Sequence, residues 1–179
     1  MWTTVNHPEA IVDFTGKLQR ISAFLITGQG DGKFLEFSRL KAKAQAGYNP
    51  KNIVTTDFLN ASTSVPIFSP RLVEKLGKEL DTDADFYPCT ITCQGQEFDF
   101  FAAKIKTRVD LIDKELSTYR TLTDGEKSLM KAAYKTHFDR DFLLARDSGE
   151  LFDFAVSEIF RDLAYKHALD ISFIERPQA

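Results

Sequence analysis

The clearest hydrophobic pattern in the chain lies between residues 65 and 80. A short apolar run, Val65–Phe68, leads into Ser69 and Pro70, after which apolar positions recur every three or four residues. A serine before a helix accepts hydrogen bonds from free N–H groups of the first turn, and proline fits that turn because it has no N–H of its own. We therefore predict a strand that runs directly into a capped helix with one buried face. The residues of that face are Leu72, Val73, Leu76 and Leu80.

A second segment with the same order lies near the C-terminus, at residues 151–175. Ser157 is a candidate cap after a strand-like run that carries Asp153 on its outward side, and a final strand is predicted after the helix. When the two serines are aligned, the apolar positions of the two helices are offset by one residue. We therefore interpret the segments as a repeated supersecondary unit and not as a proven duplication. The predicted inner face of the second helix comprises Phe160, Leu163, Ala164 and His167.

A hairpin is predicted after the first helix. Residues 86–93 are rich in aromatic and β-branched side chains, Gln94–Gln96 form a turn around a glycine, and residues 97–103 are predicted as a returning strand. This pattern is typical of two antiparallel strands. Pro88 indicates an edge or a bulge early in the first of them, because proline cannot donate a ladder hydrogen bond. One face of the returning strand carries Phe98, Phe100 and Ala102.

The N-terminal third gives weaker signals, most of them from glycine. The pattern Asn6-His-Pro-Glu9 predicts a helix that continues to Phe14 and ends at Gly16. Residues 21–27 and 34–37 are predicted as strands joined by a loop at Gly28–Gly32, where three glycines permit positive φ. This glycine cluster is not a phosphate loop, because the lysine and hydroxyl that follow such a loop and the spacing of a dinucleotide fingerprint are both missing.

Two more helices are predicted on local signals. A short one spans residues 41–46 and is closed by Gly47. The other begins at Thr123-Asp-Gly-Glu126, a capping box in which the threonine and the glutamate satisfy each other's backbone N–H groups. This helix is expected to continue to about His137. Its predicted buried residues are Leu129, Met130 and Ala133.

Together these elements predict an α+β protein with a mixed or antiparallel sheet and packed helices, built around the two strand–helix–strand units. The chain of 179 residues suits a single domain, 1–179, and can bury enough apolar surface to fold without disulfides or metals. The alternative is an N-terminal lobe of residues 1–60 and a C-terminal lobe of residues 61–179 that share one core.

Composition narrows the function classes. The 16 phenylalanines are spread through the strand-like segments, which favours an aromatic-rich core between sheet and helices. A formal net charge of −3 disfavours a general nucleic-acid binder or an anionic-membrane binder, because both need a dense basic face. The expected location is cytoplasmic, since the N-terminus lacks a signal-peptide pattern and no apolar run could span a bilayer.

Candidate catalytic and metal-binding groups do not form a known pattern. Cys89 and Cys93, four residues apart in a predicted strand, are roughly 13 Å apart and face the same way, which suits neither a disulfide nor zinc. His137 near aspartate and arginine is interpreted as a helix-end partner and not as an acid–base pair. We expect no enzyme activity, no cofactor and no metal, although a triad assembled from distant residues stays open.

Five short segments, taken in their order along the chain, resemble immunity proteins of bacterial polymorphic toxin systems. This family is the myxobacterial-type immunity domain, once classed as a domain of unknown function. The five segments cover about the C-terminal two thirds of the chain, within which the helix predicted from Thr123 looks like an insertion. Where the family usually has a glycine turn between the last helix and strand, this chain has His167–Asp170. The segments are Asp57–Leu59, Val65–Leu72, Phe86–Pro88, Val109–Ser117 and Phe154–Phe160.

The resemblance implies a protein that binds and neutralises a cognate toxin made by the same bacterium, without catalysis of its own. The alternative is a small-ligand-binding protein or an uncharacterised enzyme with a pocket between the two repeated units. Acidic residues in two stretches are the candidate partner-binding groups, because they could steer association with a basic toxin. A solvated face is the competing interpretation of these acids. They are Asp81, Asp83, Asp85, Asp110, Asp113 and Glu115.

Overall fold

The structure is a computed structural model that describes residues 2–5 and 11–175. It mixes helices and strands and is broadly α+β, as the sequence predicts. No helix within the described residues is long and apolar enough to cross a membrane. The helical elements are α1 (Leu18–Ser22), the π-helical turn η1 (Ala23–Thr27), the 3-10 turn η2 (Lys33–Leu35), α2 (Pro50–Thr55), α3 (Pro70–Leu76) and α4 (Glu158–Lys166).

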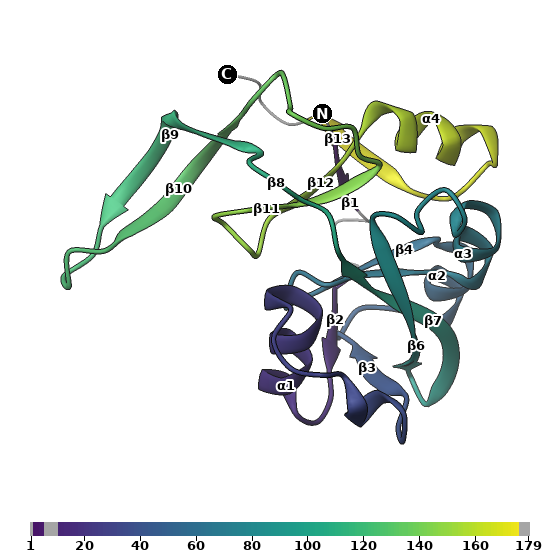
Figure 1. Cartoon of the computed structure of the whole chain (residues 1–179). Helices are drawn as coiled ribbons and strands as arrows, with labels where there is room; N and C mark the ends of the chain where they lie inside the picture. Colours follow the sequence, from purple (N-terminus) through teal and green to yellow (C-terminus); the bar gives the residue numbers. More distant parts are fainter. Residues whose placement is uncertain (1, 6–10, 176–179) are drawn as a thin grey trace.

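Six strands form a barrel in the lower part of Figure 1. The barrel closes because β2 pairs antiparallel with β3 on one side and parallel with β4 on the other. Its pairing is mixed, since β3 also runs parallel to β6. In spatial order the strands are β2 (Ile11–Phe14), β3 (Leu40–Ala44), β6 (Ala84–Cys93), β7 (Gln96–Ile105), β5 (Pro66–Phe68) and β4 (Phe58–Ala61).

A second sheet of five strands joins the two ends of the described chain. The first strand, β1, pairs antiparallel with the last one, β13, and with β12. At the far edge β8 runs parallel to β11. The spatial order is β13 (Ser172–Glu175), β1 (Trp2–Val5), β12 (Phe154–Val156), β11 (Leu144–Asp147) and β8 (Arg108–Val109).

The remaining two strands, β9 (Ile112–Thr121) and β10 (Lys127–Tyr134), pair only with each other. We call this antiparallel pair the arm. Figure 1 shows it extending to one side, away from both other sheets.

The predicted hairpin after α3 is confirmed. Strands β6 and β7 pair in unbroken register from Ala84 opposite Ile105 to Cys93 opposite Gln96. The turn places Gln94 and Gly95 at positive φ, which glycine adopts without steric cost. Pro88 is tolerated because pairing between β6 and β3 begins only at the next residue.

Both predicted serine caps are also present. The Ser69 hydroxyl accepts a hydrogen bond from the Leu72 N–H at 3.0 Å, and the Ser157 hydroxyl accepts one from the Phe160 N–H at 3.2 Å. The fully buried positions of the two helices match, and the offset is confined to partly buried residues, Val73 in α3 and Leu163 in α4. In each of them the third and the seventh residue after the serine are buried. These residues are Leu72 and Leu76 in α3, and Phe160 and Ala164 in α4.

The two helices share one apolar cluster that lies between the barrel and the second sheet. The rings of Phe68, on β5, and Phe160, on α4, are 6.5 Å apart within it. A separate cluster fills the barrel, and a smaller one lies under the base of the arm. The predicted phenylalanine-rich core is thus present, although Phe37 and Phe152 are exposed.

The prediction of a helix ending at Gly16 is wrong for residues 11–14, which form β2; its start at Asn6–Glu9 lies outside the described residues. Val12 and Phe14 are buried while Asp13 is only partly so, which is the two-residue period of a strand. Pairing with two neighbouring strands therefore decides the conformation of this segment.

The remaining N-terminal predictions, for residues 18–46, are also wrong. Residues 21–27, predicted as a strand, are helical in α1 and η1, and residues 34–37 form no strand. Residues 41–46, predicted as a helix, belong largely to β3. Its burial alternates, with Leu40, Ala42 and Ala44 inside the barrel. Apolar runs this short do not distinguish helix from strand without their neighbours.

The helix predicted from Thr123 is a strand hairpin instead. Asp124 accepts a hydrogen bond from the Glu126 N–H at 3.0 Å, and Gly125 has a φ of +87°. The same four residues that resemble a capping box thus form the turn of the arm, and an Asp-Gly pair is a strong hairpin signal. Leu129 and Ala133 are partly buried, whereas Met130 is 61% exposed.

Candidate functional site

The first group of predicted partner-binding residues does not form one acidic surface. Asp81 lies in the exposed turn after α3, and Asp85 forms an ion pair with Lys106 at 2.8 Å. The hydrogen bond to Asp85 raises the pKa of Lys106, so the lysine stays charged at neutral pH. Only part of this group is therefore free to contact a partner.

Asp83 has a structural role in the core. It is 4% exposed, and its carboxylate accepts hydrogen bonds from the Thr107 hydroxyl at 2.5 Å and from the N–H groups of Leu143 and Leu144 at 2.6 and 3.1 Å. These bonds join the start of β6 to the segment that leads into β11. A buried carboxylate with these donors stabilises the fold, and we therefore remove Asp83 from the candidate surface.

The second group, Asp110, Asp113 and Glu115, lies together at the base of the arm. Asp110 pairs with Lys135 at 2.5 Å, a contact that raises the pKa of the lysine. Asp113 accepts hydrogen bonds from the N–H groups of Glu115 and Leu116 at 2.9 and 3.1 Å. Glu115 is exposed on β9 and is the member of this group best placed to meet a partner.

The base of the arm is held firmly to the body. Asp147, almost fully buried on β11, accepts hydrogen bonds from the N–H groups of Leu111 and Ile112 at 2.8 and 3.0 Å. At the return strand, the buried Tyr134 donates its hydroxyl to the carboxylate of Asp153. Sequence analysis missed both anchors, because neither aspartate lies in a recognisable motif.

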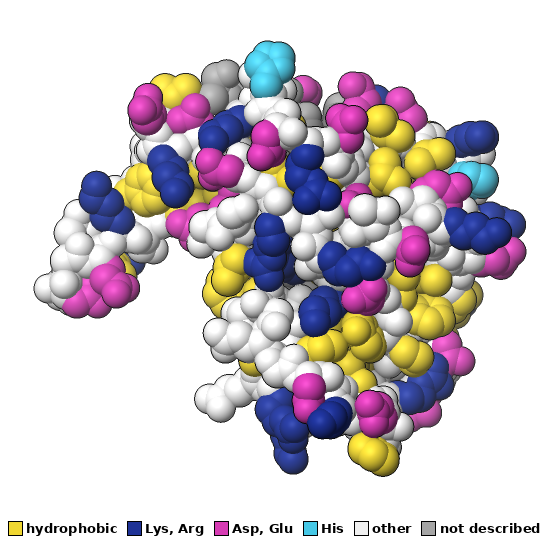
Figure 2. Space-filling view, in the orientation of Figure 1, with side chains coloured by type: hydrophobic (Ala, Val, Ile, Leu, Met, Phe, Trp, Pro, Cys, Tyr) yellow, Lys and Arg dark blue, Asp and Glu magenta, His cyan; other side chains and the backbone are white. Residues whose placement is uncertain are grey.

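Beyond its base the arm offers both apolar and charged groups. Leu116 and Met130 are each 61% exposed. Residues 112–134 contain four acidic and four basic side chains, so the arm carries no net charge. Figure 2 shows the arm standing clear of the body with side chains of both charges on it. This composition suits a protein contact better than a nucleic-acid contact.

Two segments that carry the family resemblance meet at a buried carboxylate. Asp57 accepts hydrogen bonds from the Ser69 hydroxyl, from the guanidinium of Arg71, and from the Asp170 N–H at 2.7 Å. The hydrogen bond to Asp57 raises the pKa of Arg71, which also donates to the Ala168 carbonyl at 3.1 Å. We call this set the Asp57 hub. The hub joins the segment before β4, the start of α3 and the turn before β13. These residues of the resemblance segments therefore stabilise the fold.

A buried cation links the barrel to the second sheet. Arg146, on β11, is fully buried and donates to the carbonyls of Leu151 and Ser64 at 2.6 and 3.0 Å. Burial lowers its pKa to about 10, with a further contribution from Arg108, and it remains protonated at neutral pH. No ion pair to Arg146 is found in the described part of the chain.

The candidate catalytic residues are the two cysteines, Cys89 and Cys93, and His137. Burial raises the pKa of Cys89 to about 12, so its thiol is neutral and a poor nucleophile at pH 7. His137 is exposed and follows β10, so the expected helix-end role does not apply. Across residues 2–5 and 11–175 no three His, Cys, Asp or Glu side chains are grouped as a metal site would need.

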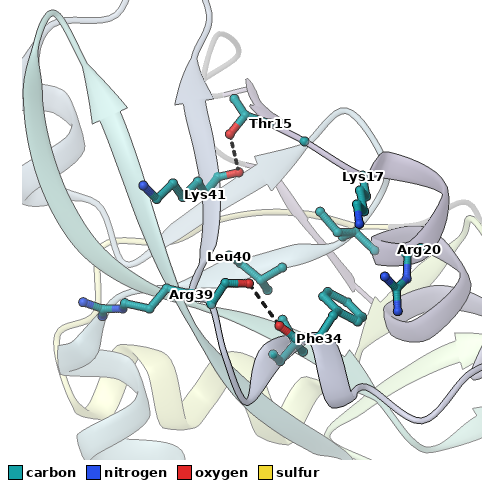
Figure 3. A pocket seen from close by; sticks show the side chains of 11 residues that line it. Thr15, Lys17, Arg20, Phe34, Arg39, Leu40 and Lys41 are labelled. Atoms are coloured by element: carbon teal, nitrogen blue, oxygen red, sulfur yellow. Dashed lines mark hydrogen bonds between the residues drawn. The ribbon is translucent and has the colours of Figure 1, made fainter.

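One pocket of about 390 Å³ lies between α1, η2 and the start of β3. Figure 3 shows Lys17 and Arg20 on one side of it, with Phe34 and Leu40 facing them. Arg39 and Lys41 extend in the opposite direction (Figure 3), and Arg39 pairs with Asp99 on β7 at 2.9 Å. The pocket thus combines an apolar wall with a cationic edge. None of the predicted site residues contributes to it.

Comparisons with known proteins do not add a family to this picture: no model of a known protein family matches the chain, and a search of curated proteins gives no match either.

Proposed function

We propose that this protein binds and neutralises a cognate bacterial toxin, and that the arm supplies the main contact surface. The resemblance described above motivates the toxin as the partner. The observation that carries the proposal is the arm itself, a long strand pair outside both other sheets.

The exposed arm has the features of a recognition element. A two-stranded hairpin alone is marginally stable in water, and the outer edge of each strand presents unpaired backbone N–H and carbonyl groups. Natural proteins use such edges to add a strand from a partner, with backbone hydrogen bonds for affinity and side-chain pockets for specificity. The exposed Leu116 and Met130 provide apolar contacts beside that edge.

The anchoring of the arm supports the same proposal. The hydrogen bonds that the N–H groups of residues 111 and 112 donate to Asp147, and that Tyr134 donates to Asp153, fix the direction of the arm before a partner arrives. A preorganised surface loses less conformational entropy on binding than a flexible one. The resemblance segment Val109–Ser117 runs from β8 into the arm, so family-like residues lead into the proposed surface.

The alternative pocket between the two repeated units receives no support from the packing there. Apolar side chains, including Phe68 and Phe160, occupy the contact between the two helices. We therefore do not place a ligand or an enzyme site at that position.

The test is to express the adjacent toxin gene in a sensitive host with and without this protein, and to isolate the complex. Survival must depend on this protein, and both proteins must co-purify. Rescue without a complex would point instead to an enzyme that repairs or modifies the target. Absence of rescue would remove the immunity proposal for that pair.

The contact surface is tested by the double variant Leu116→Arg/Met130→Arg. Both side chains are exposed, so folding should be kept while rescue and complex formation are lost. The matched control is Val54→Arg, which places an arginine at an equally exposed apolar position on α2. Loss of the complex in the control and not in the arm variant would reject the arm as the interface. Because the arm has no net charge, added salt should weaken the complex only modestly.

A further inference from the structure

The pocket at α1 has a charge that differs from the rest of the molecule. The chain has a formal net charge of −3, yet the pocket lining includes four basic side chains and, among the described residues, no carboxylate. The basic residues are Lys17, Arg20, Arg39 and Lys41. A concave site with one sign of charge concentrates ions of the opposite sign.

Two of these cations are available to a ligand. Arg39 is engaged by Asp99, and Lys41 extends away from the opening (Figure 3). Within the described residues neither Lys17 nor Arg20 has a carboxylate in ion-pair contact. Hydrogen bonds from Lys33 lower the pKa of the Asp31 carboxyl, and Arg20 is near enough to lower it further. The guanidinium of Arg20 lies 5.3 Å from the centre of the Phe34 ring, which holds it beside the apolar wall.

The apolar part of the lining is held in place. Ile21 and Leu40 are almost fully buried, and Phe34 packs edge-on against Phe24 with ring centres 6.1 Å apart. Hydrogen bonds to main-chain carbonyls fix the rim, since the Ser38 hydroxyl donates to the Phe34 carbonyl at 3.0 Å and the Thr15 N–H donates to the Lys41 carbonyl at 2.8 Å. An apolar surface with a few fixed polar groups is typical of small-molecule sites, which measure about 300–1,000 Å³.

From these observations we propose that the pocket binds a small organic anion with an apolar body. The body packs on Phe34, Leu40 and Ile21, and the anionic group contacts Lys17 and Arg20. Inorganic phosphate has no apolar body to pack on the apolar residues, and a neutral apolar molecule has no charge to pair with the two cations. Each would therefore make only part of the contacts. This site is separate from the arm and does not depend on the toxin-binding proposal.

The experiment uses the full chain and three probes: 2-naphthoate, its neutral analogue 2-naphthamide, and inorganic phosphate. Calorimetric titration should give the highest affinity for naphthoate, with the other two weaker by about tenfold or more, the loss expected for one missing charge-assisted or apolar contact. In ¹H–¹⁵N spectra, naphthoate should shift the amide signals of residues around Ile21, Phe34 and Leu40.

Charge-removing variants test whether binding depends on the cations of the pocket or on the overall charge of the protein. Lys17→Gln and Arg20→Gln should each weaken naphthoate binding by about tenfold. Lys43→Gln removes the same charge from an exposed position on β3 that does not line the pocket, and should leave binding unchanged. Thermal melting of each variant shows whether it remains folded.

The proposal fails if naphthoate does not bind at millimolar concentration, or if naphthamide binds equally well. It also fails if Lys43→Gln weakens binding as much as Arg20→Gln, or if the signal shifts fall outside the pocket. If Arg20→Gln unfolds the protein, Lys17→Gln and the spectral map still decide the outcome.

Discussion

The two serine-capped junctions of this molecule share a local design and differ in what surrounds it. In both, a buried three-residue strand, β5 or β12, leads into a serine whose hydroxyl caps the N–H of the third residue that follows. Ser69 is buried and also donates to Asp57, whereas Ser157 is partly exposed and its helix begins with surface ion pairs from Arg161. The same local signal is therefore supported by a buried polar hub in one place and by solvated charges in the other.

This difference teaches that a cap fixes where a helix begins but not how much the junction contributes to stability. Buried hydrogen bonds are costly to break, because the remaining partners cannot return to water. Surface ion pairs contribute little, because water and salt compete with them. We expect the first junction to be sensitive to polar substitutions and the second to depend on its apolar contacts.

The largest effect should come from the cluster that the two junctions share. Phe160→Ala should lower the free energy of unfolding by about 3–5 kcal/mol, because it removes a fully buried ring and leaves a cavity. Urea denaturation measures this, with Ile159→Ala as the exposed control on the same helix. A loss below that of the control would show that α4 does not depend on the shared cluster.

The next effect separates the junctions. Asp57→Asn should lower the free energy of unfolding by about 1.5–3 kcal/mol, since the neutral amide weakens its bonds to Ser69 and Arg71. Glu158→Gln, which weakens the ion pair to Arg161 at the second junction, should give no measurable change. Equal effects of the two substitutions would contradict the comparison.

A pH effect distinguishes the strands that follow the two helices, because β6 carries the buried Cys89 while β13 is largely exposed. Burial raises the pKa of this thiol from 9.0 to about 12. Between these values the unfolded chain releases a proton that the folded chain retains, so folding stability falls as pH rises. The loss is about 1.4 kcal/mol per pH unit for this group.

Cys89→Ala should make the loss of stability between pH 9 and pH 11 less steep, as measured by urea denaturation at each pH. The substitution also costs stability at neutral pH, so only the slopes are compared. Identical slopes would mean that the thiol ionises equally in the folded and unfolded chains.

The smallest effect concerns the caps themselves. Ser157→Ala should cost about 0.5–1 kcal/mol, within the range for loss of one cap. Ser69→Ala should cost about 1–2 kcal/mol, because it also removes the donor to Asp57. Thermal melting of both variants under one set of conditions gives the ranking. The reverse ranking would show that the Asp57 hub adds nothing to the first cap.

Sequence reasoning selected some residues that belong to the surface proposed above. It selected Asp110, Asp113 and Glu115, which the structure gathers at the base of the arm. It also selected Asp83, which is buried, because a carboxylate in a polar turn looks the same in sequence whether it faces water or backbone N–H groups. The pocket at α1 was not predicted, since its walls come from residues 15–21 and 34–41 and meet only in the folded chain.

What the sequence by itself determined are the elements whose signals are local: the two serine-capped helices and the hairpin at Gln94–Gly95. A cap or a tight turn is satisfied by residues within a few positions of it, so the preference for that conformation does not depend on distant partners. The box at Thr123–Glu126 carries two local signals, a helix cap and an Asp-Gly turn, and the pairing of β9 with β10 selects the turn. Only the tertiary structure decided that residues 11–14 and 40–44 are strands. A strand gains its hydrogen bonds from distant partners, and these short segments have no local signal strong enough to outweigh that pairing.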